Sequence, residues 1–223
     1  VNSFNITYDS LIGNPADHVI LALLPNYIEQ GESSLVCMVE HLIRRTQNSL
    51  SGFYLDDFAA LIDTYKKAIV DGKKVVLFGV SYALMDLAEL KPDLSNALII
   101  ETGGMKGRRA EITKNELHEL LAHGLNCAHI SSEYGMTEML SQAYLNADGV
   151  FKSSTQLKVL IRDVNDPFHF IDKEKTGGIN VIDLANLYSC SFIATQDLGR
   201  IVKGGFEVMG RFDNADLRGC NLL

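Results

Sequence analysis

The sequence predicts an α/β fold, in which a mostly parallel sheet flanked by helices is followed by a smaller antiparallel, β-rich or barrel-like part. Over the first two thirds of the chain, short apolar runs alternate with stretches of helical spacing, a pattern typical of a parallel sheet covered by helices. After about residue 150, short strands separated by turn residues replace this alternation, which indicates antiparallel sheet. We therefore expect an α/β subdomain over residues 1–150 and a β-rich subdomain packed on it over residues 151–223.

The elements of the first part follow from buried runs and from helix start signals. The predicted strands are apolar and rich in β-branched residues, and they cover residues 18–24, 74–79, 97–101 and 127–131. The predicted helices carry apolar residues at helical spacing, and they cover residues 35–45, 56–70, 83–90, 113–123 and 136–145. Ser33 and Ser34 offer an N-cap for the first helix, and Thr113 with Glu116 has the pattern of a capping box.

The second part contains few stretches of helical spacing. Its predicted strands are short and bounded by turn residues, and they cover residues 157–162, 178–183, 199–203 and 206–209. No repeat and no low-complexity linker separates this part from the first, so we expect the two parts to share an interface.

Composition and charge exclude several classes of protein. Hydrophobic residues make up 47% and charged residues 22% of the 223 residues, a globular composition with ample material for a core. The formal net charge of −8 argues against nucleic acid as a partner, because phosphate binding needs clustered Lys and Arg. No apolar run reaches the ~18–20 residues that span a bilayer, and no signal peptide is visible. The four cysteines lack metal-ligand spacing and are interpreted as free thiols, so we expect a cytoplasmic protein.

Two loops occupy the place where open α/β sheets bind ligands, the carboxyl ends of strands. The first is Glu-Thr-Gly-Gly-Met at residues 101–105, where Gly103 and Gly104 let the backbone approach a flat or charged ligand closely. The alternative for this loop is a plain turn. The second is Ser-Glu-Tyr-Gly-Met-Thr-Glu at residues 132–138, which leads into the predicted helix 136–145.

The second loop has features that suit a nucleotide. The amino end of a helix offers free N–H groups and positive partial charge to a phosphate. Thr137 adds a hydroxyl donor, Glu138 adds a carboxylate that can hold a Mg²⁺ bridging to phosphate oxygens, and Tyr134 can stack on a base. The alternative is that Thr137 only caps the helix and that Glu138 only complements its dipole.

The last third of the chain adds two further candidates. Thr-Gln-Asp-Leu-Gly at residues 195–199 places Asp197 in a predicted turn before a strand, where its carboxylate can accept hydrogen bonds from two vicinal hydroxyls. Gly-Arg-Phe-Asp at residues 210–213 follows a strand, and Arg211 can donate to the same sugar or to a phosphate. Each segment alone is also common turn chemistry, so their joint order carries the information.

The order Tyr-Gly-x-Thr-Glu, Thr-x-Asp-x-Gly, Gly-Arg-x-Asp resembles that of the adenylate-forming superfamily, which includes acyl-CoA ligases, luciferases and peptide-synthetase adenylation domains. Within it, the sequence looks most like the acyl-protein synthetases, the LuxE-like fatty-acid ligases. Residues 131–144, 177–186 and 210–223 support this, and the resemblance extends from about Leu21 to Leu223. It implies the N-terminal domain of such a ligase, which uses ATP and Mg²⁺ to convert a carboxylic acid, expected to be a fatty acid, to an acyl-adenylate.

The resemblance also implies roles on the adenine side of an ATP site. Gly103 and Gly104 would line the adenine pocket, and Tyr134 would pack on the base. The neighbouring residues of the same loop would complete this nucleotide-binding segment: Glu133, Gly135 and Met136.

On the phosphate and ribose side, the resemblance implies four more residues. Thr137 would contact the α-phosphate and Glu138 would hold Mg²⁺, which makes both candidates for catalysis. Asp197 would bind the ribose hydroxyls, with Arg211 beside it.

The sequence departs from the superfamily in two respects. A phosphate loop of the form Thr-Ser-Gly-Thr-Thr-Gly is missing, so we expect that an N-terminal portion is absent and that this chain alone is an inactive fragment. The chain also ends ten residues after Asp213 without the lid domain of acyl-CoA ligases, as in the acyl-protein synthetases.

Acyl-protein synthetases transfer the acyl group to a cysteine of their own near the C-terminus, and the resemblance makes Cys220 this nucleophile. A partner acyl-CoA reductase or acyl-acceptor protein would then receive the acyl group. A small buried residue is the alternative for Cys220, and the other three cysteines, in apolar runs, are expected in the core. The alternatives for the whole protein are an acid–CoA ligase of the phenylacetate type and a non-catalytic binding relative that has lost the phosphate loop.

Overall fold

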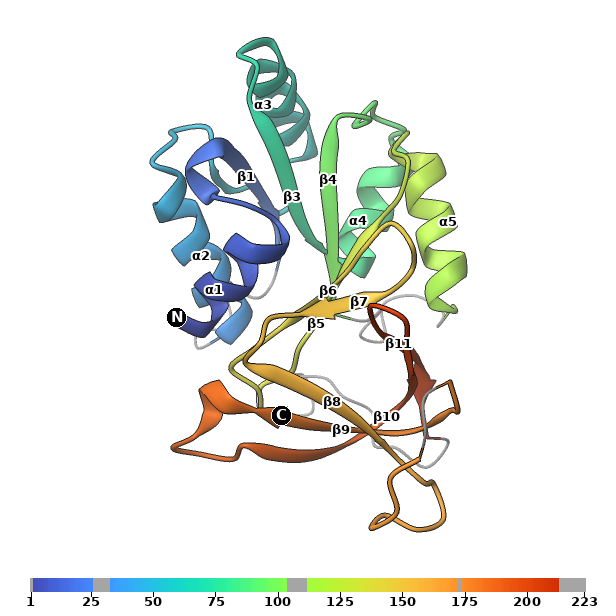
Figure 1. Cartoon of the computed structure of the whole chain (residues 1–223). Helices are drawn as coiled ribbons and strands as arrows, with labels where there is room; N and C mark the ends of the chain where they lie inside the picture. Colours follow the sequence, from blue (N-terminus) through green and yellow to red (C-terminus); the bar gives the residue numbers. More distant parts are fainter. Residues whose placement is uncertain (1, 26–32, 104–111, 172–173, 213–223) are drawn as a thin grey trace. The chain divides into compact units, whose positions relative to one another are not determined.

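The structure, a computed structural model, describes residues 2–25, 33–103, 112–171 and 174–212 (Figure 1). The chain divides into two compact units, Gly13–Glu133 and a second unit that joins residues 1–12 to residues 134–223. The first is called the parallel unit below and the second the antiparallel unit. The unit boundary lies within a strand, between Glu133 and Tyr134. As domains, the ranges 1–150 and 151–223 stay a prediction.

The parallel unit contains a sheet in the order β2-β1-β3-β4-β5 among the described residues. Its strands pair in parallel throughout, as the alternating sequence pattern predicts. Every residue of β1 is buried, and so is every residue of β3 except Lys74, the expected state of central parallel strands covered on both faces. The strands are β1 (His18–Leu23), β2 (Gly52–Phe53), β3 (Lys74–Val80), β4 (Ala97–Thr102) and β5 (Ser131–Tyr134).

Helices flank this sheet, with α2 against β1, α3 against β3 and α4 beside α5 (Figure 1). Two of them, α2 and α5, begin at the predicted caps. Ser33 Oγ accepts a hydrogen bond from the Val36 amide, and Thr113 and Glu116 form both bonds of a capping box. The predicted helices of this unit are therefore confirmed, with small shifts at their ends. They are η1 (Pro15–Asp17), α2 (Ser34–Thr46), α3 (Phe58–Val70), α4 (Ser81–Glu89) and α5 (Lys114–Gly124).

The antiparallel unit contains a sheet in the order β6-β7-β11-β10-β9-β8. Its described pairings are antiparallel, which confirms the β-rich second part of the fold. Helix α1 was not predicted. Part of its buried face is polar, since Ser3 bonds to Ser141 and Thr7 to Ser154, and hydrophobic periodicity does not detect such contacts. The elements are α1 (Asn2–Leu11), β6 (Ala143–Leu145), β7 (Phe151–Ser153), β8 (Leu157–Arg162), β9 (Gly177–Asp183), η2 (Leu184–Asn186), β10 (Phe192–Val202) and β11 (Gly205–Arg211).

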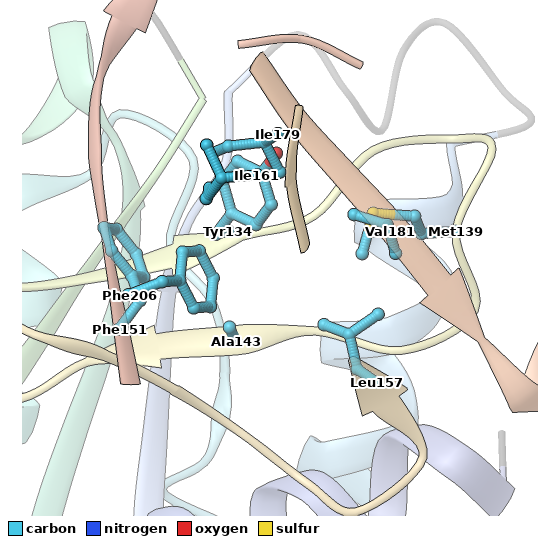
Figure 2. Close-up of a cluster of buried hydrophobic side chains, with 9 residues drawn as sticks. All are labelled: Tyr134, Met139, Ala143, Phe151, Leu157, Ile161, Ile179, Val181 and Phe206. Atoms are coloured by element: carbon cyan, nitrogen blue, oxygen red, sulfur yellow. The ribbon is translucent and has the colours of Figure 1, made fainter. Parts of the chain in front are cut away.

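A compact hydrophobic cluster forms the core of the antiparallel unit (Figure 2). The rings of Phe151 and Phe206 stack with their centroids 5.5 Å apart, and the ring of Tyr134 meets both edge-on, at 5.9 and 5.6 Å. Tyr134 is also the first residue of the Tyr-Gly-Met-Thr-Glu motif. The core of this unit therefore anchors the start of that motif.

Two further expectations concern the surface. The described cysteines are free, as expected, but Cys37 and Cys190 are exposed rather than in the core, and Cys127 is half-buried. Within the described ranges, no helix has the length and apolarity needed to cross a bilayer.

Candidate functional site

The Tyr-Gly-Met-Thr-Glu motif does not lead into a helix, so the helix predicted over residues 136–145 is wrong. The segment forms a single turn at Thr137 and Glu138, which the amide of Met139 closes by donating to the Met136 carbonyl at 3.0 Å. The next two amides, of Leu140 and Ser141, do not continue a helical ladder. Both donate to Oδ2 of Asp183, at 2.7 and 3.0 Å. This segment therefore offers no helix amino end to a phosphate.

Tyr134 is the last residue of β5, and this strand begins at Ser131, where the strand predicted over residues 127–131 ends. Its ring is buried in the hydrophobic cluster, 9% exposed (Figure 2). Its hydroxyl donates to Oδ2 of Asp197 at 2.8 Å. The two ends of the side chain thus have different tasks, since the ring packs in the core and the hydroxyl orients a carboxylate.

Asp197 lies inside β10, so the turn predicted over residues 195–199 is wrong. The register between β9 and β10 shifts between Ala194 and Leu198, which marks a bulge-like irregularity in the strand. Thr195 Oγ1 donates to the Ile179 carbonyl at 2.9 Å and accepts from the Asp197 amide at 3.1 Å. This irregularity explains why residues typical of a turn occur at positions 195–199 within a strand. The two bonds of Thr195 fix the backbone next to the Asp197 carboxylate.

Arg162 supports the same irregularity from β8. Its Nη2 donates to the Thr195 carbonyl at 2.6 Å, and its Nη1 donates to the Ile179 carbonyl at 2.9 Å. Burial lowers the pKa of the Arg162 guanidinium. A partly desolvated guanidinium needs several acceptors. We therefore infer that Arg162 stabilises the backbone next to Asp197 rather than binding a ligand.

Arg211 lies opposite Asp197 in the register of β10 and β11. Its Nε lies 3.8 Å from Asp197 Oδ1, and its Nη2 donates to Gln196 Oε1 at 2.7 Å. The structure therefore brings Tyr134, Asp197 and Arg211 together. Among the described residues, the Asp197 carboxylate accepts one hydrogen bond, from Tyr134, and a carboxylate has about four acceptor positions.

Thr137 and Glu138 lie on the exposed turn that follows, whereas Gly135 and Met136 are half-buried and Met136 packs against the hydrophobic cluster. Asn186 Nδ2 donates to the Glu138 carbonyl at 2.6 Å, which fixes the backbone below the exposed carboxylate. The described residues contain no group of three or more metal-ligand side chains. A single carboxylate still fits Mg²⁺, because this ion is commonly held by one or two carboxylates together with substrate phosphates and water.

In the parallel unit, Gly103 follows β4 with a φ of +80°, a left-handed conformation that favours glycine. Its carbonyl oxygen lies 2.6 Å from Ser81 Oγ, so the first residue of α4 contacts the beginning of this loop. Gly104 and Cys220 lie outside the described residues.

A cluster of hydrogen bonds in this unit, called the Glu101 hub below, surrounds the carboxylate of Glu101, which lies one residue before the end of β4 and is 2% exposed. This carboxylate accepts from Ser81 Oγ at 2.5 Å and from Ser132 Oγ at 2.8 Å, and Lys114 Nζ lies 3.4 Å away. His118 Nε2 lies 2.9 Å from Ser132 Oγ. Because Ser132 gives its one proton to Glu101, His118 must be the donor in this bond.

These contacts decide the charge of two neighbouring carboxyls. Burial raises the pKa of Glu101, but nearby His118, whose Nε2 lies 3.9 Å away, together with Lys114, Ser81 and Ser132 outweighs burial and lowers this pKa to about 2. The pKa of Glu133, in contrast, is raised by burial, although Thr102 Oγ1 donates to this carboxylate at 2.8 Å. Glu133 thus lies near Glu101, but its donor from Thr102 does not outweigh the effect of burial on its pKa.

The sequence motifs predict no role for Glu101, His118 or Asp183. A signal existed for Glu101 and Asp183, since each stands at or next to the end of an apolar strand, where a buried carboxylate requires partners. His118 gave no such signal, because a histidine on a helix face is common and its partner Ser132 lies fourteen residues away in the sequence.

Comparison with known proteins supports the fold. No model of a known protein family matches the sequence, and no curated protein is significantly similar to it. Solved structures do match. ATP-bound MatB from Rhodopseudomonas palustris superposes with a TM-score of 0.66 at 17% identity, over 94% of this chain and 43% of that one.

Two further solved structures match over most of this chain. The luciferase-like enzyme from the mealworm Zophobas morio has a TM-score of 0.60 at 16% identity, over 94% of this chain and 53% of that chain. A long-chain-fatty-acid-CoA ligase from Archaeoglobus fulgidus has a TM-score of 0.58 at 15% identity, over 89% of this chain and 44% of that chain. The chain therefore has the fold of the N-terminal domain of adenylate-forming enzymes, and it spans about half the length of these structures or less.

The Glu101 hub predicts an acid-sensitive contribution to stability. The folded-state pKa of about 2 lies below the ordinary value of 4.5, so the contribution is present above about pH 4.5 and is lost as the pH falls toward 2. A Glu101→Gln variant should lower the free energy of unfolding by about 3 kcal/mol at pH 7. This deficit, measured by urea denaturation, should shrink between pH 4.5 and 2.

The control is Glu119→Gln, which changes an exposed glutamate of α5 and should leave stability within about 0.5 kcal/mol at every pH. A deficit of Glu101→Gln that stays constant from pH 7 to pH 2 would contradict the assigned charge of Glu101.

Proposed function

We propose that this chain is the nucleotide-binding part of an enzyme that uses ATP to activate a carboxylic acid as its acyl-adenylate. The observation that carries the proposal is the meeting of Tyr134, Asp197 and Arg211, which come from three separate motifs. These motifs follow one another in the order of the adenylate-forming superfamily. Further support comes from the shared fold, which in one similar structure holds ATP.

Asp197 is proposed to bind the ribose of ATP. Its carboxylate keeps acceptor capacity beyond its bond from Tyr134, and vicinal hydroxyls are donors that a carboxylate can take as a pair. Arg211 lies beside it and can donate to the same sugar. The Tyr134 ring has little exposed surface, so its proposed contact with adenine involves the rim of the ring rather than a whole face.

Thr137 and Glu138 are proposed to act at the phosphates. A substrate carboxylate oxygen attacks the α-phosphorus, the bond from this phosphorus to the bridging oxygen of the β-phosphate breaks, and pyrophosphate leaves with the electron pair. A carboxylic acid is already ionised near neutral pH, so no protein base is required. The Thr137 hydroxyl can donate to a phosphate oxygen, and catalysis is then mainly positioning and charge stabilisation. A Mg²⁺ held by Glu138 would neutralise phosphate charge.

The acceptor of the acyl group distinguishes two versions of the proposal. The resemblance to acyl-protein synthetases favours the thiol of Cys220, whose sulfur would attack the acyl carbon and release AMP. A similar solved structure is a CoA ligase, which favours the thiol of coenzyme A instead. The resemblance to acyl-protein synthetases also suggests a fatty acid as the substrate and a reductase or acyl-acceptor protein as the next partner.

The full-length protein should catalyse exchange of radioactive pyrophosphate into ATP that depends on an added carboxylic acid. Glu138→Gln should reduce this exchange by about 100-fold, because it removes the proposed metal ligand at the charged phosphates. The Glu119→Gln variant serves as the matched control and should keep the wild-type rate. Saturable ATP binding without exchange for any acid in a panel of fatty and aryl acids would contradict the enzyme and support a binding relative.

The ribose contact predicts a change in nucleotide selectivity. The wild-type protein should bind ATP about tenfold or more tightly than 2′,3′-dideoxy-ATP, since a hydrogen bond to a charged group is worth roughly 1.5–3 kcal/mol. Asp197→Ala should bind both nucleotides with similar affinity. Titration calorimetry measures the ratio, and a variant that keeps the wild-type preference for ATP would remove Asp197 from the ribose site.

The acceptor is tested by incubating the protein with ATP and a radioactive fatty acid. A label that stays on the denatured protein, is released by hydroxylamine and is lost in Cys220→Ser identifies the cysteine as acceptor. Label retained in Cys220→Ser would exclude this cysteine, and transfer only to added coenzyme A would favour the CoA ligase.

A further inference from the structure

The carboxylate of Asp183, at the end of β9, has no exposed surface and is surrounded by hydrogen-bond donors. Oδ2 accepts from the amides of Leu140 and Ser141, at 2.7 and 3.0 Å. Oδ1 accepts from Ser141 Oγ at 2.7 Å and from the Ala185 amide at 3.1 Å. Each oxygen therefore takes two donors, and three of the four belong to Leu140 and Ser141, which follow the turn closed by Met139.

Asn186 lies three residues after Asp183 and binds the same segment through the carbonyl of Glu138. Its Nδ2 donates to the Glu138 carbonyl at 2.6 Å and to the Cys190 carbonyl at 2.8 Å. Both amide hydrogens are thus used, and Asn186 is 4% exposed. Asp183 and Asn186 together fix the backbone from Glu138 to Ser141, and we call this pair the turn clamp.

The clamp is itself supported from the N-terminal helix. Ser3 Oγ lies 2.8 Å from Ser141 Oγ, and Ser141 gives its one proton to Asp183. Ser3 must therefore be the donor in their bond. The contact joins α1 to the segment after the turn, so the clamp connects three parts of the antiparallel unit that are distant in the sequence.

We propose that Asp183 and Asn186 are positioning residues that hold Thr137 and Glu138 in the conformation that binds the phosphates and metal of ATP. The inference rests on the proposed function of this loop. Its physical basis is that the amides of Leu140 and Ser141 would otherwise be available to a helical ladder, which would turn Thr137 and Glu138 into helix residues. The clamp removes these donors and keeps the turn exposed.

Asp183→Asn tests the clamp with almost no change of volume. An amide replaces one acceptor oxygen by a donor group, so two of the four donors around Asp183 lose their acceptor. Asn186→Ala is a second variant, which removes both bonds to the Glu138 and Cys190 carbonyls and stays informative if the first variant does not fold. Asp163→Asn is the matched control, because Asp163 caps backbone amides in an exposed loop.

Two measurements are made on the full-length protein and its variants. The first is calorimetric titration with ATP, with and without MgCl₂. In wild type, Mg²⁺ should increase the affinity for ATP, and in Asp183→Asn and Asn186→Ala this increase should be about tenfold smaller. The affinity for ATP without Mg²⁺ should stay within about threefold of wild type in both variants. The second is amide hydrogen exchange without ligand, where the amides of Leu140 and Ser141 should exchange about tenfold faster in Asp183→Asn.

The outcomes separate the clamp from the function. If wild type binds no ATP, the proposed function fails and the positioning role fails with it. If wild type binds Mg²⁺-ATP and both clamp variants keep the full effect of Mg²⁺, only the positioning role is wrong. An equal loss of ATP affinity with and without Mg²⁺ would indicate a merely structural role and would also overturn the proposal. The Asp163→Asn control should match wild type in every measurement.

Discussion

The Asp183 carboxylate is a buried charge, and its four hydrogen bonds decide the shape of the segment on which the candidate site depends. Leaving such a group unpaired away from water is costly, so the chain must supply donors for both oxygens. The donors come from Leu140, Ser141 and Ala185. At the other end of the same segment, the Tyr134 ring is fixed in the hydrophobic cluster. Between these two anchors the chain has room for a short exposed turn, and Thr137 and Glu138 occupy it.

The parallel unit uses a comparable device. Glu101 lies near the carboxyl end of β4 and accepts from Ser81 at the start of α4 and from Ser132 in β5, with Lys114 of α5 beside it. Since the loops after parallel strands meet at one edge of a sheet, a single buried carboxylate can tie several of them together. In the antiparallel unit, Thr137 and Glu138, which are proposed to contact the phosphates and metal, are exposed, whereas Asp183 and Asn186, which hold their segment, are buried and hydrogen-bonded. This division matches what a preorganised binding site requires.

The local signals in the sequence predicted much of the fold. Capping residues such as Ser33 and Thr113, and the apolar runs of the central parallel strands, act over a few residues and were sufficient for helices α2 to α5 and strands β1, β3 and β4. The wrong predictions of secondary structure have a common cause, which is hydrogen bonding between residues that are distant in the sequence. The helix expected after Met136 is absent because Asp183, more than forty residues later, takes its amides. For the same reason, Asp197 lies in a strand whose irregularity depends on Arg162. The site residues were named by resemblance, and their partners become visible only in the folded chain.

The central claim is that the exposed turn and the Asp197 carboxylate form the nucleotide-binding surface of an acid-activating enzyme. A crystal structure of the full-length protein with ATP and Mg²⁺ tests this claim most directly. The account predicts the ribose hydroxyls within hydrogen-bond distance of Asp197, and the metal bound by Glu138. It also predicts that the amides of Leu140 and Ser141 remain on Asp183. A nucleotide bound away from both carboxylates, or bound only after residues 136–145 become helical, would contradict it.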